Sequence, residues 1–319
     1  IVGRLVGKEG KDVNYYTPET LSEGSKWGKA YESKQKVAVL YATGEIQEHS
    51  KSGIDCYRLV PQITKLAEED DVKALVLRVN SPGGSVFGSE QIGEALDYFK
   101  SKGKPFIVSM GDYAASGGYW ISCTADKIYA DPLTITGSIG IFGLFPSAEG
   151  LVKKLGITPQ TVSTNPGKEI SLFNDPTSEQ LEVLQSYIND GYSRFVKRVA
   201  KGRKMKEERV RQIAEGRVYD AEQAMKLKLV DKLGSLDDAI AYAASEAGLK
   251  NDKYGVAVYP KYKPDFLDIL KAQGLDQLNM EIAKISGQNP ESVIIQKTAA
   301  LLRRSPWQAR MAPTYLHFN

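Results

Sequence analysis

Three uncharged, glycine-rich runs of the sequence combine residue types that can carry out acyl transfer. They read NSPGGSV at residues 80–86, AASGGYW at 114–120 and TGSIG at 136–140. Each run stands at the end of an expected β-strand, and strand ends are where α/β sheets bind ligands. Serine hydroxyls are potential nucleophiles, and the small neighbours leave room for an acyl group. The three runs together favour nucleophilic catalysis.

Ser116 is the candidate nucleophile. It falls where a strand gives way to a helix, between Ala115 and Gly117, as in a nucleophile elbow. The N–H of Gly117 and the helix dipole would stabilise the oxyanion that forms when Ser116 attacks. The same pattern fits an N-cap serine followed by close helix packing, and the spacing leaves both interpretations open.

Gly83 and Gly84 are candidates for an oxyanion hole. They follow Pro82 directly after a strand, so their N–H groups have no side chain in front of them. A plain type II turn, with proline followed by glycine, explains the same residues.

Lysine is the favoured base for such a serine, because the chain has only two histidines. His49 lies in a polar loop and His317 is two residues from the C-terminus. Lys168 is the candidate, since it precedes an apolar cluster that would keep its amine neutral. Ser138, in the third run, would hydrogen-bond this amine. A solvated loop lysine and a turn serine are the alternatives.

Composition excludes several other classes of protein. The 319 residues are 42% apolar and 25% charged, with a net charge of +3 and both signs interspersed, so we expect a soluble globular chain and no nucleic-acid partner. Two cysteines, Cys56 and Cys123, are too few for a disulfide framework or a zinc cluster. We expect no metal and no cofactor. The longest uncharged stretch is broken by glycine and proline, so no membrane span is expected within the chain.

Strand and helix patterns alternate through the centre of the sequence, which predicts an α/β fold with parallel strands. The expected strands are Val37–Tyr41, Ala74–Val79, Phe106–Met110, Lys127–Ala130 and Val256–Tyr259. The expected helices are Tyr57–Ala67, Ser89–Phe99, a helix from Ser116, Ala148–Lys154 and Ser178–Lys201, with amphipathic segments at Phe266–Leu278 and Val293–Leu302.

Several longer runs carry a resemblance to a known family. Residues 77–86 (LRVNSPGGSV), 114–122 (AASGGYWIS) and 133–142 (LTITGSIGIF) resemble signal peptide peptidase A, also called protease IV. The runs GRVYD at 216–220 and KLVD at 228–231 resemble its later motifs. The resemblance covers about residues 36–248 and implies serine peptidases of the Clp protease/crotonase fold, with repeated β-β-α units and a helical extension.

The resemblance implies three segments and a set of site residues. Residues 1–35 would be a linker, 36–250 the catalytic domain, and 251–319 an extension for oligomerisation or membrane proximity. Ser116 matches the nucleophile of a Ser/Lys dyad, and Ser138 matches the serine that orients the lysine. The oxyanion-hole amides match Gly83 and Gly117, with Gly84 a substitute for the first.

The resemblance leaves two sources for the lysine. In short members of the family one domain supplies both partners, and Lys168 falls roughly where their lysine lies. In double-length members the serine comes from the C-terminal half and the lysine from the N-terminal half. The NYY run at 14–16 and the Tyr119-Trp120 pair resemble the C-terminal half of a long member.

The function implied is a serine endopeptidase that degrades cleaved signal peptides through an acyl-enzyme. Its partners would be extended apolar peptides, lying along strand edges near Gly83 and Gly140, and copies of itself in a homo-oligomeric ring. The resemblance also implies a membrane tether upstream of Ile1 and an extracytoplasmic, periplasmic active site. The alternatives are a crotonase-type acyl-CoA enzyme, and a non-catalytic scaffold or half that needs a lysine from another domain.

Overall fold

The computed structural model describes residues 35–50, 52–160, 170–249 and 254–260, and the backbone of 307–310. The strands are β1 (Lys36–Thr43), β2 (Ile46–Gln47), β3 (Ile54–Asp55), β4 (Val72–Ser81), β5 (Gly83–Ser85), β6 (Phe106–Ala115), β7 (Lys127–Ala130), β8 (Ile135–Gly137), β9 (Phe142–Gly143), β10 (Val218–Asp220), β11 (Lys232–Leu233), β12 (Gly255–Tyr259) and β13 (Trp307–Arg310). The helices are α3 (Cys56–Glu68), α4 (Val86–Ser101), α5 (Gly117–Trp120), α6 (Glu149–Lys154), α7 (Ser178–Arg203), α8 (Glu207–Ile213), α9 (Ala221–Lys226) and α10 (Leu236–Glu246).

The main sheet is parallel except at one edge, as the alternation of elements predicts. Its strand order is β10-β8-β6-β4-β1-β12, with β7 beside β6 and β11 beside β7. Only β10, which pairs with β8, runs antiparallel to its neighbour. The central strands are nearly continuous apolar runs, because helices cover both of their faces. The α/β fold class is therefore confirmed.

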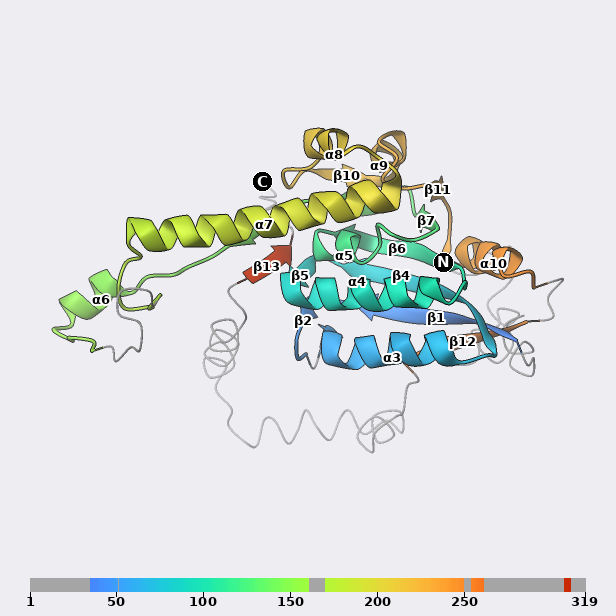
Figure 1. Cartoon of the computed structure of the whole chain (residues 1–319), viewed down its shortest axis with the longest axis horizontal. Coiled ribbons are helices and arrows are strands. Elements are labelled where there is room, and N and C mark those ends of the chain that lie inside the picture. Colours follow the sequence, from blue (N-terminus) through green and yellow to red (C-terminus); the bar gives the residue numbers. More distant parts are fainter. Residues whose placement is uncertain (1–34, 51, 161–169, 250–253, 261–306, 311–319) are drawn as a thin grey trace, which may run out of the picture.

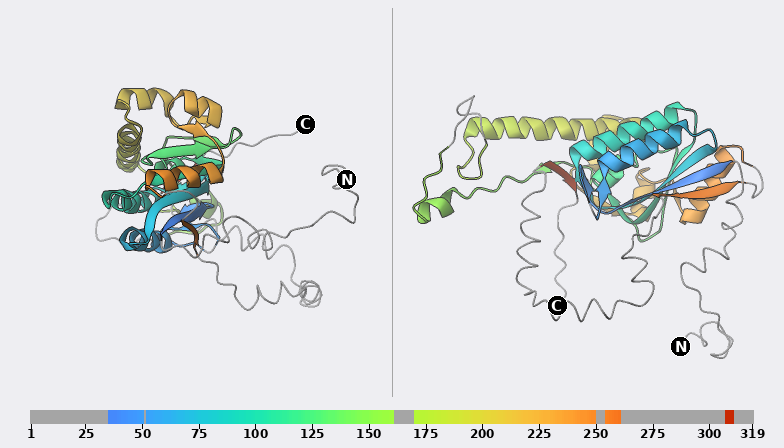
Figure 2. Two further views of the ribbon diagram at one scale, coloured as in Figure 1. Left: turned by 90° about the vertical axis from the view of Figure 1, so that its right-hand side faces the viewer. Right: turned by 90° about the horizontal axis from the view of Figure 1, so that it is seen from below.

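Two hydrophobic layers hold helices to the sheet (Figure 1). Leu40 and Leu77 face the layer that contains α3 and α4, while Val39 and Val76 face α10. Alternate residues of one strand thus enter opposite layers, as the pleat requires. Figure 2 shows the same arrangement from below, with α3 and α4 on one side of the sheet and α10 on the other.

Helix starts match short sequence signals. Asp55 accepts a hydrogen bond from the Arg58 N–H at the start of α3, and Ser85 accepts one from the Gly88 N–H at the start of α4. Thr177 forms a capping box at the start of α7. These caps satisfy N–H groups that have no partner inside the helix. The polar residue before each apolar pattern therefore sets where the helix begins.

An arm made of α6, residues 170–177 and the N-terminal half of α7 extends away from the sheet (Figure 1). Both helices begin within one residue of where the sequence predicts them. Several large apolar side chains in this arm are exposed, among them Leu151, Leu155, Leu172, Phe173 and Leu181. The arm therefore presents an apolar surface that the described part of the chain does not cover.

The strand at Val256–Tyr259 is confirmed as β12, which pairs with β1. Cys56 and Cys123 are free and buried. The linker and the two amphipathic C-terminal segments lie outside the described residues. No helix in the described ranges has the length and the hydrophobicity to pass through a bilayer.

We expect Gly202→Ala to lower the free energy of unfolding by about 1–3 kcal/mol, because an overpacked side chain displaces its neighbours. A Cβ at Gly202 would lie 2.3 Å from the carbonyl oxygen of Cys123, where α7 crosses the segment after α5. Gly150 is the matched control, since its Cβ would meet nothing within 4 Å. Urea denaturation measures both variants. Equal stability of the two would contradict the close contact.

Candidate active site

The parallel topology gathers the three glycine-rich runs at one edge of the sheet. Ser81, at the end of β4, pairs with Ala114 near the end of β6. Ala115 pairs in turn with Gly137, the last residue of β8. Because neighbouring strands end side by side, the residues that follow them, Ser116 and Ser138, lie at the same edge.

Ser116 occupies a strained turn between β6 and α5. Its backbone has φ 55° and ψ −118°, a conformation that residues with a side chain rarely adopt. Its N–H donates to the Gly137 carbonyl at 2.9 Å, and its carbonyl accepts from the Trp120 N–H at 2.8 Å. Two backbone hydrogen bonds therefore hold the turn, as in a nucleophile elbow.

The Ser116 hydroxyl itself has no partner within the described part of the chain. The residue is fully buried, and Oγ is one of two buried side-chain polar atoms there without a hydrogen bond. Ser116 occupies the N-cap position of α5, as one interpretation of the sequence predicts, but its side chain makes no capping hydrogen bond. A buried hydroxyl without a partner is rare and is compatible with a group kept for chemistry.

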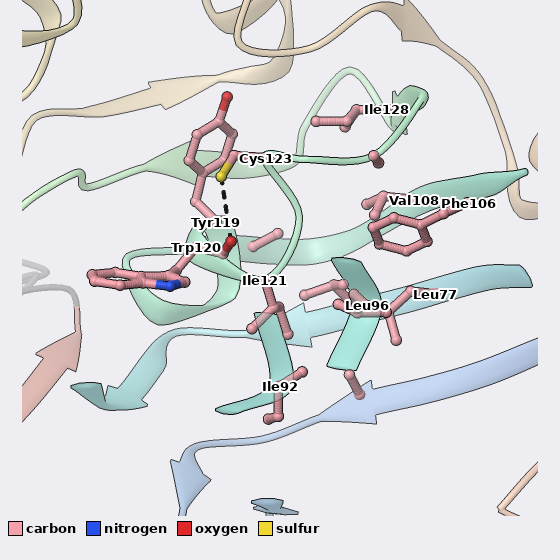
Figure 3. Packing of buried hydrophobic residues seen from close by; sticks show 14 of the residues in the cluster. Leu77, Ile92, Leu96, Phe106, Val108, Tyr119, Trp120, Ile121, Cys123 and Ile128 are labelled. Carbon is pink, nitrogen blue, oxygen red and sulfur yellow. Dashed lines mark hydrogen bonds between the residues drawn. The ribbon is translucent and has the colours of Figure 1, made fainter. Parts of the chain in front are cut away.

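The helix behind Ser116 is fixed by close packing. A Cβ on Gly118 would lie 2.6 Å from the Ser81 carbonyl oxygen, so only glycine fits. The Tyr119 hydroxyl donates to the Leu229 carbonyl at 2.9 Å, and burial raises the pKa of this phenol. The Trp120 ring lies 4.6 Å from that of Phe195. Figure 3 shows Tyr119 and Trp120 on opposite sides of this short helix. The turn that carries Ser116 is thus anchored in the core.

The Gly83–Gly84 pair forms strand β5 and not an isolated turn. Gly83 has φ 100° and Gly84 φ 151°, both accessible to glycine. A Cβ on Gly84 would lie 2.1 Å from the Ile46 carbonyl oxygen. The backbone of β2 therefore lies so close to Gly84 that no other residue fits there. The Gly83 N–H donates to Ser81 Oγ at 3.1 Å. Both glycines belong to the strand that β13 pairs with, Gly83 opposite Arg310 and Gly84 opposite Ala309.

Ser138 directly follows β8 and, like Ser116, has a positive φ. Its φ is 49°, its side chain is buried, and its N–H donates to the Arg217 carbonyl at 2.7 Å. The Ser116 N–H donates to the carbonyl of Gly137, the residue before Ser138. This hydrogen bond holds the two serines next to each other at the C-terminal ends of β6 and β8.

The base is the component that the structure does not place, because Lys168 lies outside the described residues. Within the described ranges no lysine donates to or accepts from the Ser116 hydroxyl. The His49 ring contacts the ring of Tyr57 at 4.7 Å, between β2 and α3. His317, like Lys168, is not described.

Sequence reasoning missed the strand β13. It pairs antiparallel with β5, with Gln308 opposite Ser85 and Arg310 opposite Gly83, and also with β9. The strand has only four residues, and its partner strands are far away in the sequence. No local sequence pattern therefore predicts this pairing. An extended segment of the chain therefore occupies the edge beside the candidate oxyanion amides.

Comparisons with known proteins agree with this geometry. A model of peptidase family S49 matches residues 98–250, and a Clp protease model matches 22–132. Protease 4 of Salmonella typhi is 44% identical over 216 residues, which are 67% of this chain and 35% of that protein. Protease 4 of Haemophilus influenzae is 40% identical, over 70% of this chain and 36% of that protein. The chain thus spans about a third of the length of these two relatives.

A shorter relative is covered more fully. The protein of Enterococcus faecium named "Putative signal peptide peptidase SppA" is 36% identical over 253 residues. The match takes in 76% of this chain and 73% of that protein. The similarity therefore extends over most of a relative of comparable length.

Proposed function

The chain belongs to peptidase family S49, and from this premise we propose that it is a serine endopeptidase with Ser116 as nucleophile. The observation that carries the proposal is the Ser116 hydroxyl, which is buried, held in a strained turn and without a hydrogen-bond partner among the described residues. Its neighbours at the sheet edge are glycine amides and a second serine. No charged side chain belongs to the runs that form this edge, which suits an acyl-transfer site better than acid/base chemistry by carboxylates.

In the proposed reaction Ser116 Oγ attacks the carbonyl carbon of a peptide bond, and its proton passes to a neutral lysine amine. The N–H groups of Gly83 and Gly117 donate to the oxyanion, with Gly84 as substitute for Gly83. The lysine then protonates the leaving amine, which gives an acyl-enzyme. Water, deprotonated by the same lysine, hydrolyses the ester. Ser138 holds the amine in place.

One hydrogen bond must change during this reaction. The Gly83 N–H donates to Ser81 Oγ in the structure. An oxyanion that binds Gly83 therefore replaces the Ser81 hydroxyl as the acceptor of this hydrogen bond. The hydroxyl is able to rotate, whereas the amide is fixed by the backbone. Gly83 is therefore available to the oxyanion without movement of β5.

The proposed substrates are extended apolar peptides, such as the remnants of signal peptides. The edge of β5 supports this, because a strand that pairs there runs past Gly83 and Gly84. Backbone pairing of this kind binds a peptide with little dependence on its sequence. The Enterococcus faecium relative is named a putative signal peptide peptidase, which supports the same substrate class. We also place the active site on the extracytoplasmic side of a membrane, where signal peptides are released, which cell fractionation tests.

Covalent labelling tests the proposed function. A serine-directed phosphonate should add to Ser116, and digestion with mass spectrometry locates the adduct. An acyl-CoA enzyme of the crotonase type would turn over a thioester and leave Ser116 unlabelled. A scaffold would do neither. Absence of an adduct at Ser116, both in this chain alone and in the presence of the N-terminal half of a double-length relative, would contradict the proposal.

We expect the chain to form a closed ring through the apolar arm. Leu172 and Phe173 are roughly half exposed there, and burial between copies would remove them from water. The double variant Leu172→Asp/Phe173→Asp should sediment as smaller species than the wild type. The control Lys201→Glu lies on the exposed side of α7, near its other end, and should leave the sedimentation coefficient unchanged. A monomeric wild type at high micromolar concentration would contradict the ring.

A further inference from the structure

A pocket of about 250 Å³ lies where the C-terminal end of α7 meets α8 and α9, and none of the residues of the proposed reaction lines it. Figure 1 shows α8 and α9 together beside the C-terminal half of α7. The described residues that line the pocket include no acidic side chain but five cations, which we call the basic patch: Lys204, Lys206, Arg209, Lys226 and Lys228. The other two lining residues are Met205 and Leu227.

The charges of the basic patch are not neutralised within the described part of the chain. All five side chains are exposed, and none of them forms an ion pair with another described residue. Neighbouring cations differ in this respect, because Arg203 pairs with Asp231 at 2.8 Å and Arg211 pairs with Glu207 at 4.0 Å. The basic patch therefore keeps its positive charge although carboxylates are present nearby.

Two lysines of the basic patch stand where the backbone favours glycine or asparagine. Lys204 follows α7 with a φ of 52°, and Lys228 has a φ of 63°. A left-handed backbone is unfavourable for a residue with a Cβ. The chain thus carries lysine at two turns where glycine would fit with less strain. Residues held in such conformations are often kept for a function, and here the positive charge is what the two have in common.

The lining of the pocket favours the phosphate groups of a lipid surface over other polyanions. Its described residues include no aromatic ring on which a nucleic-acid base could stack. Met205 and Leu227 are half-buried between the cations, and the exposed Met225 immediately precedes Lys226. Apolar side chains flanked by lysines match the boundary between the headgroups and the acyl chains of a bilayer.

We propose that the basic patch docks the chain on the anionic phospholipid headgroups of a membrane surface. Lysine and arginine side chains donate charge-assisted hydrogen bonds to the headgroup phosphates. The arm through which we expect the ring to form includes the other end of α7, so ring contacts leave the basic patch accessible. Docking holds the chain beside the bilayer, where apolar peptides are released. It does not depend on which residue is the nucleophile.

Co-sedimentation of the full chain with lipid vesicles tests the docking. The vesicles contain equal parts of phosphatidylcholine and phosphatidylglycerol, and vesicles of phosphatidylcholine alone are the reference. Each cation near an anionic surface strengthens binding about fivefold, so the chain should bind the mixed vesicles at least about a hundredfold more strongly than the reference. Raising the salt concentration from about 0.05 M to about 0.5 M should remove most of this preference, because salt screens exposed charges.

Charge variants assign the binding to the basic patch. Lys226→Gln/Lys228→Gln should lower the partition coefficient about 25-fold, whereas Lys226→Arg/Lys228→Arg should preserve it, since arginine carries the same charge. The matched control, Arg58→Gln/Lys65→Gln, removes the same charge from α3, on the opposite side of the fold (Figure 1). These two side chains are 82% and 77% exposed, and their loss should change the partition coefficient less than about twofold. Circular dichroism verifies that the variants fold.

Competitors identify the source of the anion. Millimolar inorganic phosphate, or a glutamate peptide equimolar with the chain, should leave the vesicle-bound fraction the same as in chloride of equal ionic strength. Release by phosphate would assign the pocket to a small phosphate ligand, and release by the peptide would assign it to an acidic protein. Either result would overturn the proposal.

The proposal is also overturned if the chain binds both kinds of vesicle equally, or if Lys226→Gln/Lys228→Gln binds as well as the wild type. None of these measurements needs turnover, and each outcome leaves phosphonate labelling of Ser116 intact. Failure of the docking is thereby distinguished from failure of the peptidase proposal.

Discussion

Ser116→Ala is expected to lower peptide-ester hydrolysis roughly 10⁴-fold or more while leaving the free energy of unfolding almost unchanged. Loss of a nucleophile removes the covalent route, and only oxyanion and binding contributions remain. The hydroxyl has no hydrogen-bond partner among the described residues, so its removal breaks no bond there. Steady-state kinetics and urea denaturation on the same preparation measure both effects.

Ser122→Ala is the matched control for this substitution. Ser122 is also fully buried and lies six residues further along the chain, but its hydroxyl donates to the Gly118 carbonyl at 2.6 Å. Losing that bond should cost about 1 kcal/mol of stability with most of the activity retained. The two serines should thus show opposite effects. Undiminished turnover in Ser116→Ala would rule out the serine mechanism.

The sheet was predictable because its central strands are defined by local patterns. The run at Ala74–Val79 is apolar except for Arg78, as is typical of a strand buried on both faces, and β4 contains it. The end of β6 was less predictable. Its last residues, Tyr113 to Ala115, pair with β8, so the strand continues five residues past Met110. The pairing with β8, which comes later in the chain, determines this extension. The hydrophobic periodicity of the preceding residues does not predict it.

The sequence identified the candidate residues of the site but did not decide the role of each one. Ser116 matches an N-cap and a nucleophile equally well in sequence, whereas the positive φ of its turn is held by the hydrogen bond from its N–H to Gly137 of β8. Gly83 and Gly84 match a type II turn until β2 and β13 pair with them. Residue types thus locate the chemistry, while tertiary pairing assigns it.

Lys168→Ala should be as inactive as Ser116→Ala if Lys168 is the base within one chain, and the double variant should be no worse. Residues that act as one catalytic unit have effects that do not add. Lys168→Arg should not restore activity, because a guanidinium stays protonated. Activity of the wild type should rise with pH through a single ionisation well below the ordinary lysine pKa of about 10.4, since only the neutral amine accepts the Ser116 proton.

The alternative source of the base predicts a different result from the same variants. Because the chain spans about a third of its Protease 4 relatives, a preceding half is a second candidate to supply the lysine. In that case the 319-residue chain alone should hydrolyse a peptide ester very slowly, whatever residue stands at position 168. Adding the upstream half should restore activity, and the pH profile should then follow a lysine of that half. Equal rates for Lys168→Ala and wild type, with the chain alone fully active, would exclude both Lys168 and an upstream residue and leave the base to another group of this chain.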